Sequence, residues 1–390
     1  MTTTTSAPPS IRRSLLVEGW RFICHSYAVI NQWQLLALAR RPLLDLRVRD
    51  VPLWENWPQV ENLFDPARNQ ILRDLPVAPA DYRADATLRV AFPLNFAPVP
   101  AGRVLIFGTS EFRVVPRTML IGVENVTDLA ARDDFVVITP SQWAAAGFRK
   151  LDLREDQIAV IPLGVATSLF RPDAEMRATI RTDLGLRGFV FLNAGAMTTN
   201  KGIDLLLAAF AAIAEKIPDV QLVLKGVDRV YRSDGRVAEY LKRLSAHQFS
   251  RLQDRLIYIG NAATMEQMAT LYQAADAYVS PYRAEGFNLP VLEAASCGLP
   301  VICTRGGATD EFVTDDFARR VEARMKHQDG AGEAGEYLEP ELDDLIASML
   351  QAIEDREWHE RARIAGPAHA AGNFTWDLAA ARLLSTAALV

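Results

Sequence analysis

Lys201 follows a glycine-containing turn and precedes a segment with the apolar spacing of a helix. The turn begins at Gly195, directly after the apolar run 189–194, and the helical apolar positions come at i, i+3, i+4, i+7 and i+10 from Ile203. Backbone amides at a helix start, with a cationic side chain beside them, hold anionic groups such as a diphosphate. The pattern predicts an anion site here, although a solvated lysine at a helix end would have the same sequence.

Two glutamates form a second candidate site. Glu285 follows an expected strand at 276–280, and Glu293 lies about one turn into the next helix, so both could face one cleft. No cationic partner for them is obvious, and carboxylates accept hydrogen bonds from sugar and ribose hydroxyls. The pair therefore predicts hydroxyl recognition, although two glutamates at this spacing also occur by chance.

Two more candidate sites follow expected strands. Residues 260–262, centred on Asn261, could present exposed backbone to a planar base, and residues 305–311 form another glycine turn into a helix. Open α/β sheets bind ligands beyond the carboxyl ends of their strands. The order of the four sites is therefore more informative than any one of them.

The elements that must position these residues alternate between short strands and longer helices, which predicts an α/β fold with mostly parallel sheets. The segment 52–100 contains eight prolines and is expected to be mostly loop. Gly164 and Pro172 bracket an aperiodic linker, which places a domain boundary there. The expected strands are 14–18, 44–51, 88–92, 103–107, 135–138 and 158–162 in the first half, and 189–195, 220–225, 256–259, 276–280 and 300–304 in the second.

Composition narrows the class of protein. The 390 residues are 49% hydrophobic, enough for two buried cores, and a net charge of −6 argues against a dedicated nucleic-acid binder. Three cysteines without C-x-x-C spacing support neither a disulfide framework nor a zinc site. We find no signal peptide and no apolar run long enough to cross a membrane, so we expect a soluble, cytoplasmic protein. The basic residues at 40, 41, 47 and 49 give only a faint signal of peripheral membrane contact.

Several motifs in order resemble the signature of retaining GT-B glycosyltransferases of family 4. They are Lys201-Gly202, the block 280–302 and the segment 306–311, with Ser141 and residues 161–172 fitting the interdomain segment. The resemblance covers about residues 130–315. It implies two Rossmann-like domains facing across a cleft: an acceptor domain at 1–168, onto which the C-terminal helix 374–390 packs back, and a nucleotide-sugar-binding domain at 169–373.

The resemblance also implies roles for the candidate residues. Lys201 would contact the donor diphosphate, Glu285 the donor sugar hydroxyls and Glu293 the ribose hydroxyls. In such enzymes the departing phosphate itself takes the acceptor proton. We expect no metal or other cofactor, because no Asp-x-Asp motif follows a strand in the second half. The other expected donor-binding residues are Gly195, Ala196, Asn261, Gly286, Phe287, Asn288 and Leu289.

The chain departs from the family pattern in two places. Ala196 stands where an arginine commonly clamps the phosphate, and Arg283 or Lys225 could substitute for it. The usual glycine-rich loop after the first strand is replaced by residues 18–26, which contain one glycine, so the acceptor side is poorly defined.

Three side chains are candidates for that acceptor side. His25 follows the first strand and is a candidate for catalysis or acceptor contact, and Glu111 is a candidate for binding acceptor hydroxyls. Trp54, with Trp57, could stack on a sugar ring or a lipid-linked acceptor. A purely structural role stays open for each of them.

The sequence thus favours a retaining glycosyltransferase that moves a hexose-type sugar from a nucleoside diphosphate sugar to a saccharide, lipid-linked or small-molecule acceptor, in cell-envelope or secondary-metabolite assembly. A GT-B sugar-nucleotide epimerase is one alternative, although it would more often lack this set of motifs. A non-catalytic accessory subunit is the other: Ala196 favours it, whereas Lys201, Glu285 and Glu293 argue against it. The base, sugar and acceptor are left open.

Overall fold

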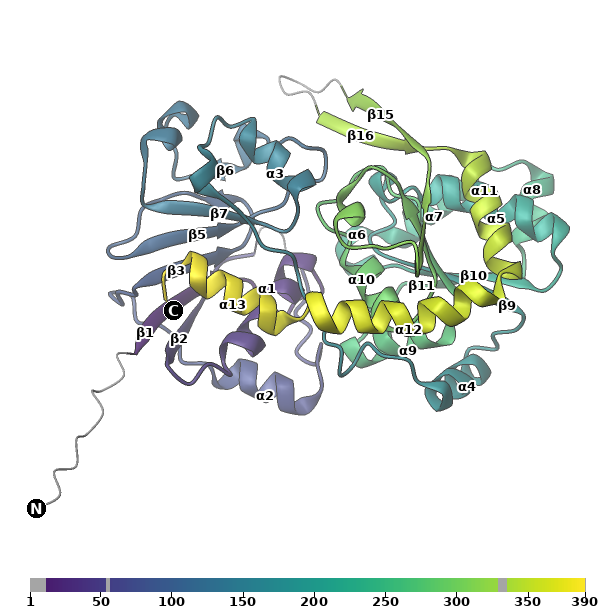
Figure 1. The fold of residues 1–390 in the computed structure, drawn as a ribbon, viewed down its shortest axis with the longest axis horizontal. Helices are drawn as coiled ribbons and strands as arrows, with labels where there is room; N and C mark the ends of the chain where they lie inside the picture. The colour runs from purple at the N-terminus through teal and green to yellow at the C-terminus, as the bar shows by residue number, and fades with distance from the viewer. Residues whose placement is uncertain (1–11, 54–56, 329–334, 390) are drawn as a thin grey trace, which may run out of the picture.

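A six-stranded parallel sheet forms the core of the first of two α/β domains (Figure 1). The computed structural model describes residues 12–53, 57–328 and 335–389. Strands β3 and β7 are buried along their whole length, as expected when helices cover both faces of a parallel sheet. In spatial order the strands are β2 (Leu44–Asp50), β1 (Arg13–Gly19), β3 (Ala86–Val90), β5 (Arg103–Phe107), β7 (Phe135–Thr139) and β8 (Ile158–Val160).

The second domain contains another six-stranded parallel sheet. Numbered within the domain, its strand order is 3-2-1-4-5-6, the order of a Rossmann-like fold. In spatial order the strands are β11 (Leu256–Ile259), β10 (Val220–Lys225), β9 (Phe189–Ala194), β12 (Ala277–Ser280), β13 (Val301–Thr304) and β14 (Ala318–Val321). The strand order changes direction between β9 and β12, although these two strands are parallel, and ligands bind beyond the strand ends at such a point. Residues just after β9 and just after β12 are therefore placed to form a site.

Helices cover both sheets. In α5 the five apolar positions expected at helical spacing, from Ile203 to Ile213, are all fully buried, which confirms that pattern. The helices of the first domain are α1 (Ser26–Leu38), α2 (Pro66–Asp74) and α3 (Gln142–Arg149). Those that follow are α4 (Ala174–Asp183), α5 (Ile203–Lys216), α6 (Asp228–Tyr231), α7 (Ser233–Leu241), α8 (Ala246–Leu252), α9 (Met265–Ala274), α10 (Leu289–Ser296), α11 (Leu342–Glu354), α12 (Arg356–Asn373) and α13 (Trp376–Thr386).

Helix α2 lies in the proline-rich segment that was expected to be mostly loop. Asp65 caps this helix by accepting hydrogen bonds from the amides of Ala67 at 2.9 Å and Arg68 at 3.0 Å, and Pro66 occupies the first turn. Proline is tolerated there because its missing N–H has no intrahelical partner to lose. Most of the described residues in 52–100 lie outside helices and strands, as expected. The helix itself was missed, although an acidic cap followed by proline is a helix-start signal.

The chain crosses between the domains twice. The first crossing is the linker after β8, and the second lies between α12 and α13, which leaves α13 against α1 of the first domain (Figure 1). The two crossings are joined where the amide of Val165 donates to the carbonyl of Phe374 at 2.8 Å. Trp376 stacks on Trp33 with ring centroids 6.4 Å apart. Within the described part of the chain, no helix has both the length and the apolar character needed to span a bilayer.

A hairpin of the second domain reaches the first. It consists of antiparallel strands β15 (Ala323–Gln328) and β16 (Gly335–Pro340), and in Figure 1 it projects toward α3 at the top of the molecule. The amide of Glu336 donates to the carbonyl of Phe112 in the first domain at 2.7 Å. Two short strands, β4 (Leu94–Asn95) and β6 (Leu120–Ile121), pair beside the first sheet.

Candidate functional site

A cavity of about 430 Å³ lies between the two domains and is lined by residues of both. From the first domain come the start of α1 and the loop after β5. From the second come the segments that follow β9, β10 and β12. The cavity therefore lies beyond the carboxyl ends of the strands, where α/β sheets bind their ligands.

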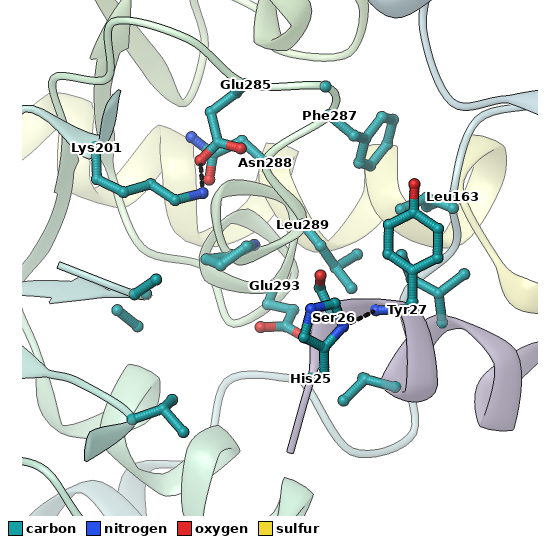
Figure 2. Close-up of a pocket in the computed structure, with 18 of the residues that line it drawn as sticks. His25, Ser26, Tyr27, Leu163, Lys201, Glu285, Phe287, Asn288, Leu289 and Glu293 are labelled. Atoms are coloured by element: carbon teal, nitrogen blue, oxygen red, sulfur yellow. Dashed lines mark hydrogen bonds and ion pairs between the residues drawn. The ribbon is translucent and has the colours of Figure 1, made fainter. Parts of the chain in front are cut away.

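Lys201 and Glu285 form an ion pair inside this cavity (Figure 2). Gly202 makes their meeting possible: its φ is +68°, and a Cβ at this position would lie 1.9 Å from the carbonyl oxygen of Pro281. Only glycine allows the loop after β9 to approach the loop after β12 this closely. The loops that follow β9 and β12 therefore bring the ammonium and the carboxylate together.

The expectation that Glu285 lacks a cationic partner was wrong, because Lys201 is that partner. Burial by itself would lower the pKa of Lys201, but the carboxylates of Glu285 and Glu111 outweigh it and raise that pKa above its ordinary value. Lys201 is thus a permanent positive charge at neutral pH. Its side chain is 21% exposed and that of Glu285 only 7%. Interactions of this pair with a ligand are consequently only weakly screened by water.

Glu111 reaches this pair from the first domain. Its carboxylate accepts a hydrogen bond from Nδ2 of Asn200 at 2.8 Å, and Asn200 also donates to the carbonyl of Ala284. Burial raises the pKa of Glu111 to about 7; Lys201 acts against this shift and Glu285 adds to it. Near neutral pH its carboxyl group is therefore present in both protonation states. Sequence reasoning selected Glu111 but missed Asn200, although Asn200 directly precedes Lys201 in the same motif.

Glu293 lines the same cavity from the second turn of α10. Its side chain accepts a hydrogen bond from the hydroxyl of the fully buried Tyr272 at 2.8 Å. Burial raises the pKa of Glu293 to about 7, while Tyr272 acts to lower it. The two glutamates of the motif do face one cavity, as their spacing suggested, and Tyr272 is a partner that the motif does not contain.

The backbone at the start of α10 presents free donors to the cavity. Within the described residues, the amides of Gly286, Phe287, Asn288 and Leu289 have no protein acceptor. Asn288 adopts φ +71° and its side chain donates to Oγ of Ser280 at 2.9 Å, which holds this turn in place. Consecutive unpaired amides at a helix start form an anion-binding arrangement.

The first domain closes over this turn. The Ser141 hydroxyl donates to the carbonyl of Gly286 at 2.6 Å. Gly286 itself leaves no room for a side chain, since a Cβ would lie 1.6 Å from Oγ1 of Thr109. Glu311, in the other glycine-turn segment of the sequence, accepts hydrogen bonds from the amides of Gln142 and Trp143 at the start of α3. That segment thus joins the domains.

His25 lies on the opposite wall, at the N-terminus of α1 (Figure 2). Its Nδ1 accepts the amide hydrogen bond of Tyr27 at 3.2 Å, and its ring stacks on Trp57 with centroids 4.7 Å apart. Burial lowers the pKa of His25 to about 4, so the imidazole is uncharged at neutral pH. The ring of Tyr231 approaches it from the second domain, with centroids 5.8 Å apart.

The overall architecture is that of known GT-B glycosyltransferases. A Rickettsia africae glycosyltransferase superposes with a TM-score of 0.69 at 15% identity, covering 96% of this chain and 98% of that one. The Anabaena protein HepE, solved with UDP and glucose, superposes with a TM-score of 0.65 at 16% identity, covering 95% and 98%. A sequence model described as glycosyl transferases group 1 matches residues 177–367. The chain belongs to this family.

Curated relatives align over much of the chain. A D-inositol 3-phosphate glycosyltransferase of Xylanimonas cellulosilytica is 31% identical over 276 residues, which are 69% of this chain and 59% of the relative. A mannosylfructose-phosphate synthase of Agrobacterium fabrum is 26% identical over 255 residues, 65% and 52%. The chain spans about half the length of the curated relatives it matches.

Arg283 and Lys225, the two cations that could replace the arginine expected at position 196, have different surroundings in the structure. Arg283 holds Asp204 at 2.7 and 2.9 Å and Glu339 at 2.9 Å, and it does not line the cavity, so its position does not favour that role. Lys225 does line it. Its ammonium donates to the main-chain carbonyls of Gly226 and, at 2.7 Å, of Asn261. The residue as a whole is only 2% exposed.

Not every candidate residue reaches the cavity. Gly195 and Ala196 line it, whereas Asn261 is exposed and contributes only the carbonyl that Lys225 binds. Trp54 lies outside the described residues. Thr109 and Tyr27 were not selected from the sequence, yet both line the cavity, and the amide of Thr109 donates to the Tyr27 hydroxyl at 3.1 Å.

Proposed function

We propose that the protein is a retaining glycosyltransferase that moves a hexose-type sugar from a nucleoside diphosphate sugar to an acceptor hydroxyl. The observation that carries this proposal is the Lys201–Glu285 ion pair beside the unpaired amides at the start of α10. It places a permanent cation, a carboxylate and backbone donors close together in an interdomain cavity. A diphosphate joined to a sugar suits this arrangement, because the cation and the backbone donors favour the anionic diphosphate and the carboxylate accepts hydrogen bonds from the sugar hydroxyls.

These groups together would bind and position the sugar donor. Lys201 and the amides of 286–289 bind the diphosphate, since aligned N–H groups and an ammonium both favour negative charge. Glu285 accepts hydrogen bonds from the hydroxyls of the sugar. Glu293, deeper in the cavity beside Tyr272, accepts hydrogen bonds from the ribose hydroxyls.

The reaction breaks the bond between the anomeric carbon and the diphosphate oxygen and forms a bond from the same face to the acceptor oxygen. The acceptor proton passes to the departing phosphate oxygen, so the protein need not supply a base. Negative charge grows on the diphosphate as the bond breaks. Lys201 and the preorganised amides stabilise that charge, which is the largest contribution a protein of this kind makes to the rate.

A donor panel tests the proposal directly. Thermal unfolding is measured with UDP, GDP, ADP and their common hexose conjugates, on the wild type and on Glu285→Gln. A ligand at 100 times its dissociation constant stabilises the folded state by about 2.7 kcal/mol, which raises Tm by a few degrees. We expect one nucleotide series to raise Tm, with a larger shift for the sugar conjugate than for the bare nucleotide.

In Glu285→Gln that extra shift should disappear while the shift from the nucleotide itself persists. Glu360→Gln, the same change on an exposed part of α12, is the matched control and should behave as the wild type. Absence of a shift from every nucleotide would contradict the proposal and leave the non-catalytic accessory subunit as the better interpretation.

Lys225 should also bind the donor. A hydrogen bond to a charged group contributes about 1.5–3 kcal/mol, so Lys225→Met should weaken donor binding by about 10–100-fold. Calorimetric titration of the donor into both proteins measures this. The expected reason is that Lys225 is a buried cation lining the cavity, whose side chain is bound by carbonyl groups.

Arg283→Met is the informative comparison for Lys225. It breaks ion pairs with Asp204 and Glu339, so Tm should fall, but donor affinity of the folded protein should change little. The reverse result, with affinity lost in Arg283→Met and kept in Lys225→Met, would show that Lys225 is only a structural residue.

A further inference from the structure

The first-domain wall of the cavity, here also called the acceptor wall, is defined by the five first-domain residues that line it with hydroxyl, imidazole or carboxyl groups; the thiol of Cys24 and apolar side chains complete the lining from this domain. Its chemistry is that of hydroxyl recognition. Glu111 offers a carboxyl group, His25 offers an imidazole, and the other three side chains offer hydroxyl groups. The five residues are His25, Ser26, Tyr27, Thr109 and Glu111. A carboxylate accepts strong hydrogen bonds from hydroxyl groups and repels other anions.

Glu111 is held in position to act on a bound acceptor. Asn200 fixes one carboxylate oxygen at 2.8 Å, from the residue next to Lys201. Lys201 and Glu285 are the charged groups close enough to influence its pKa. Lys201 is already paired with Glu285, so its charge does not neutralise Glu111 in full. An anionic group on the acceptor, next to Glu111, would therefore meet a like charge on the ionised fraction of Glu111, or would have to keep that carboxyl group protonated.

His25 adds no positive charge to this wall. Its ring is packed against Trp57 and Trp20, and its Nδ1 is occupied by the amide of Tyr27. Because burial lowers its pKa to about 4, it stays uncharged at the pH where the enzyme would work. An uncharged imidazole suits a hydroxyl group better than a phosphate.

Two cations of the first domain are paired with the hairpin. Glu336 of β16 forms ion pairs with Arg113 at 2.9 Å and with Lys150 at 3.5 Å. The guanidinium of Arg113 also lies over the Trp143 ring, 5.1 Å from its centroid. Both cations are thus paired with the hairpin, and neither lines the cavity. Residues 1–11, 54–56, 329–334 and 390 contain no lysine, arginine or histidine.

We propose that the acceptor is an uncharged polyhydroxy compound, with no phosphate or carboxylate group beside the hydroxyl that is glycosylated. This inference rests on the proposed function, because it takes the first-domain wall as the acceptor side. The lysines that line the cavity within the described residues, Lys201 and Lys225, both belong to the second domain and already have partners there: Glu285 for Lys201, and the carbonyls of Gly226 and Asn261 for Lys225. Two relatives are named for phosphorylated compounds, so the inference separates this chain from them.

The first experiment uses inorganic phosphate as the probe on the donor-loaded protein. We expect phosphate to leave the Tm of the donor-loaded wild type unchanged. Ser26 is exposed and lines the acceptor wall, so Ser26→Lys adds an ammonium there without disturbing the core. Ser26→Lys should gain phosphate-dependent stabilisation, whereas Gln70→Lys, which adds the same charge on exposed α2, should not.

The second experiment compares acceptors in matched pairs: fructose with fructose 6-phosphate, mannose with mannose 6-phosphate, and myo-inositol with inositol 3-phosphate. Release of the nucleoside diphosphate from the donor is the readout. In any pair that is turned over, kcat/KM should be at least about tenfold higher for the uncharged member, because like charges disfavour the phosphorylated one. Ser26→Lys should reduce that ratio.

Three results would overturn the inference. They are phosphate-dependent stabilisation of the donor-loaded wild type, a phosphorylated acceptor that is turned over faster than its uncharged partner, and a Ser26→Lys variant that gains no phosphate binding. Should no pair be turned over, the phosphate experiment decides alone. A protein that binds no nucleotide sugar at all would instead contradict the proposed function, so the two failures are distinguishable.

Discussion

Lys201→Met should lower kcat by about 10²–10³-fold, the loss expected when one preorganised group that stabilises developing negative charge is removed. The ammonium of Lys201 is a half-buried cation in the same cavity as the unpaired amides of α10, so water that enters after its deletion replaces its positive charge only in part. The bond-breaking step would then place charge on the diphosphate with the amides alone to stabilise it. Steady-state kinetics with the donor found in the thermal panel measures the effect.

The control for Lys201→Met must separate chemistry from folding. Removing Lys201 leaves Glu285 buried without its partner, and a buried unpaired carboxylate destabilises the fold unless it takes up a proton. Tm should therefore be measured beside kcat. Lys216→Met, an exposed lysine at the end of α5, should leave both unchanged. A Lys201→Met protein that is folded and retains near-normal kcat would rule out the proposed role.

Gly286→Ala should lower kcat/KM by at least about 100-fold, since a displacement of about 1 Å in an active site costs that much. A Cβ at 286 would lie 1.6 Å from Oγ1 of Thr109, and this contact is between domains. The protein can relieve the clash by holding the domains apart, without unfolding either one. Tm should therefore change little while transfer is lost.

A second substitution should relieve this clash. Thr109→Gly removes the side chain that the new methyl group meets, and because Thr109 lines the cavity, Thr109→Gly alone sets the baseline. Adding Gly286→Ala to Thr109→Gly should cost much less than adding it to the wild type, and a double-mutant cycle measures this coupling. An equal cost of Gly286→Ala in both backgrounds would show that the methyl group harms the amide turn itself and that domain approach is not the cause.

Local patterns predicted a large part of the candidate site. Strand runs, helical apolar spacing and the placement of charged residues after strands are set within a few turns of chain, so they can be read one segment at a time. Lys201, Glu285 and Glu293 were selected in this way, and all three line the cavity. Helix α2 was missed because proline content was weighed above the Asp65 cap.

Contacts between distant segments could not be predicted in this way. Lys201 and Glu285 are 84 residues apart, and their pairing depends on how closely Gly202 lets two loops approach. Arg283 and Lys225 were equivalent candidates in the sequence. Only folding placed Arg283 between Asp204 and Glu339 and placed Lys225 in the cavity.

The amino-acid sequence by itself determined the α/β class, the residues at the strand ends and the motifs of the family. It could do so because helix and strand periodicity, turns and caps are local properties of the chain. The tertiary structure decided that Glu111 and His25 of one domain line the same cavity as Lys201 and Glu285 of the other, and that Glu336 of the hairpin pairs with Arg113 and Lys150. Those relations depend on how two separately folded sheets meet, and the energy of that contact is spread over residues far apart in the chain.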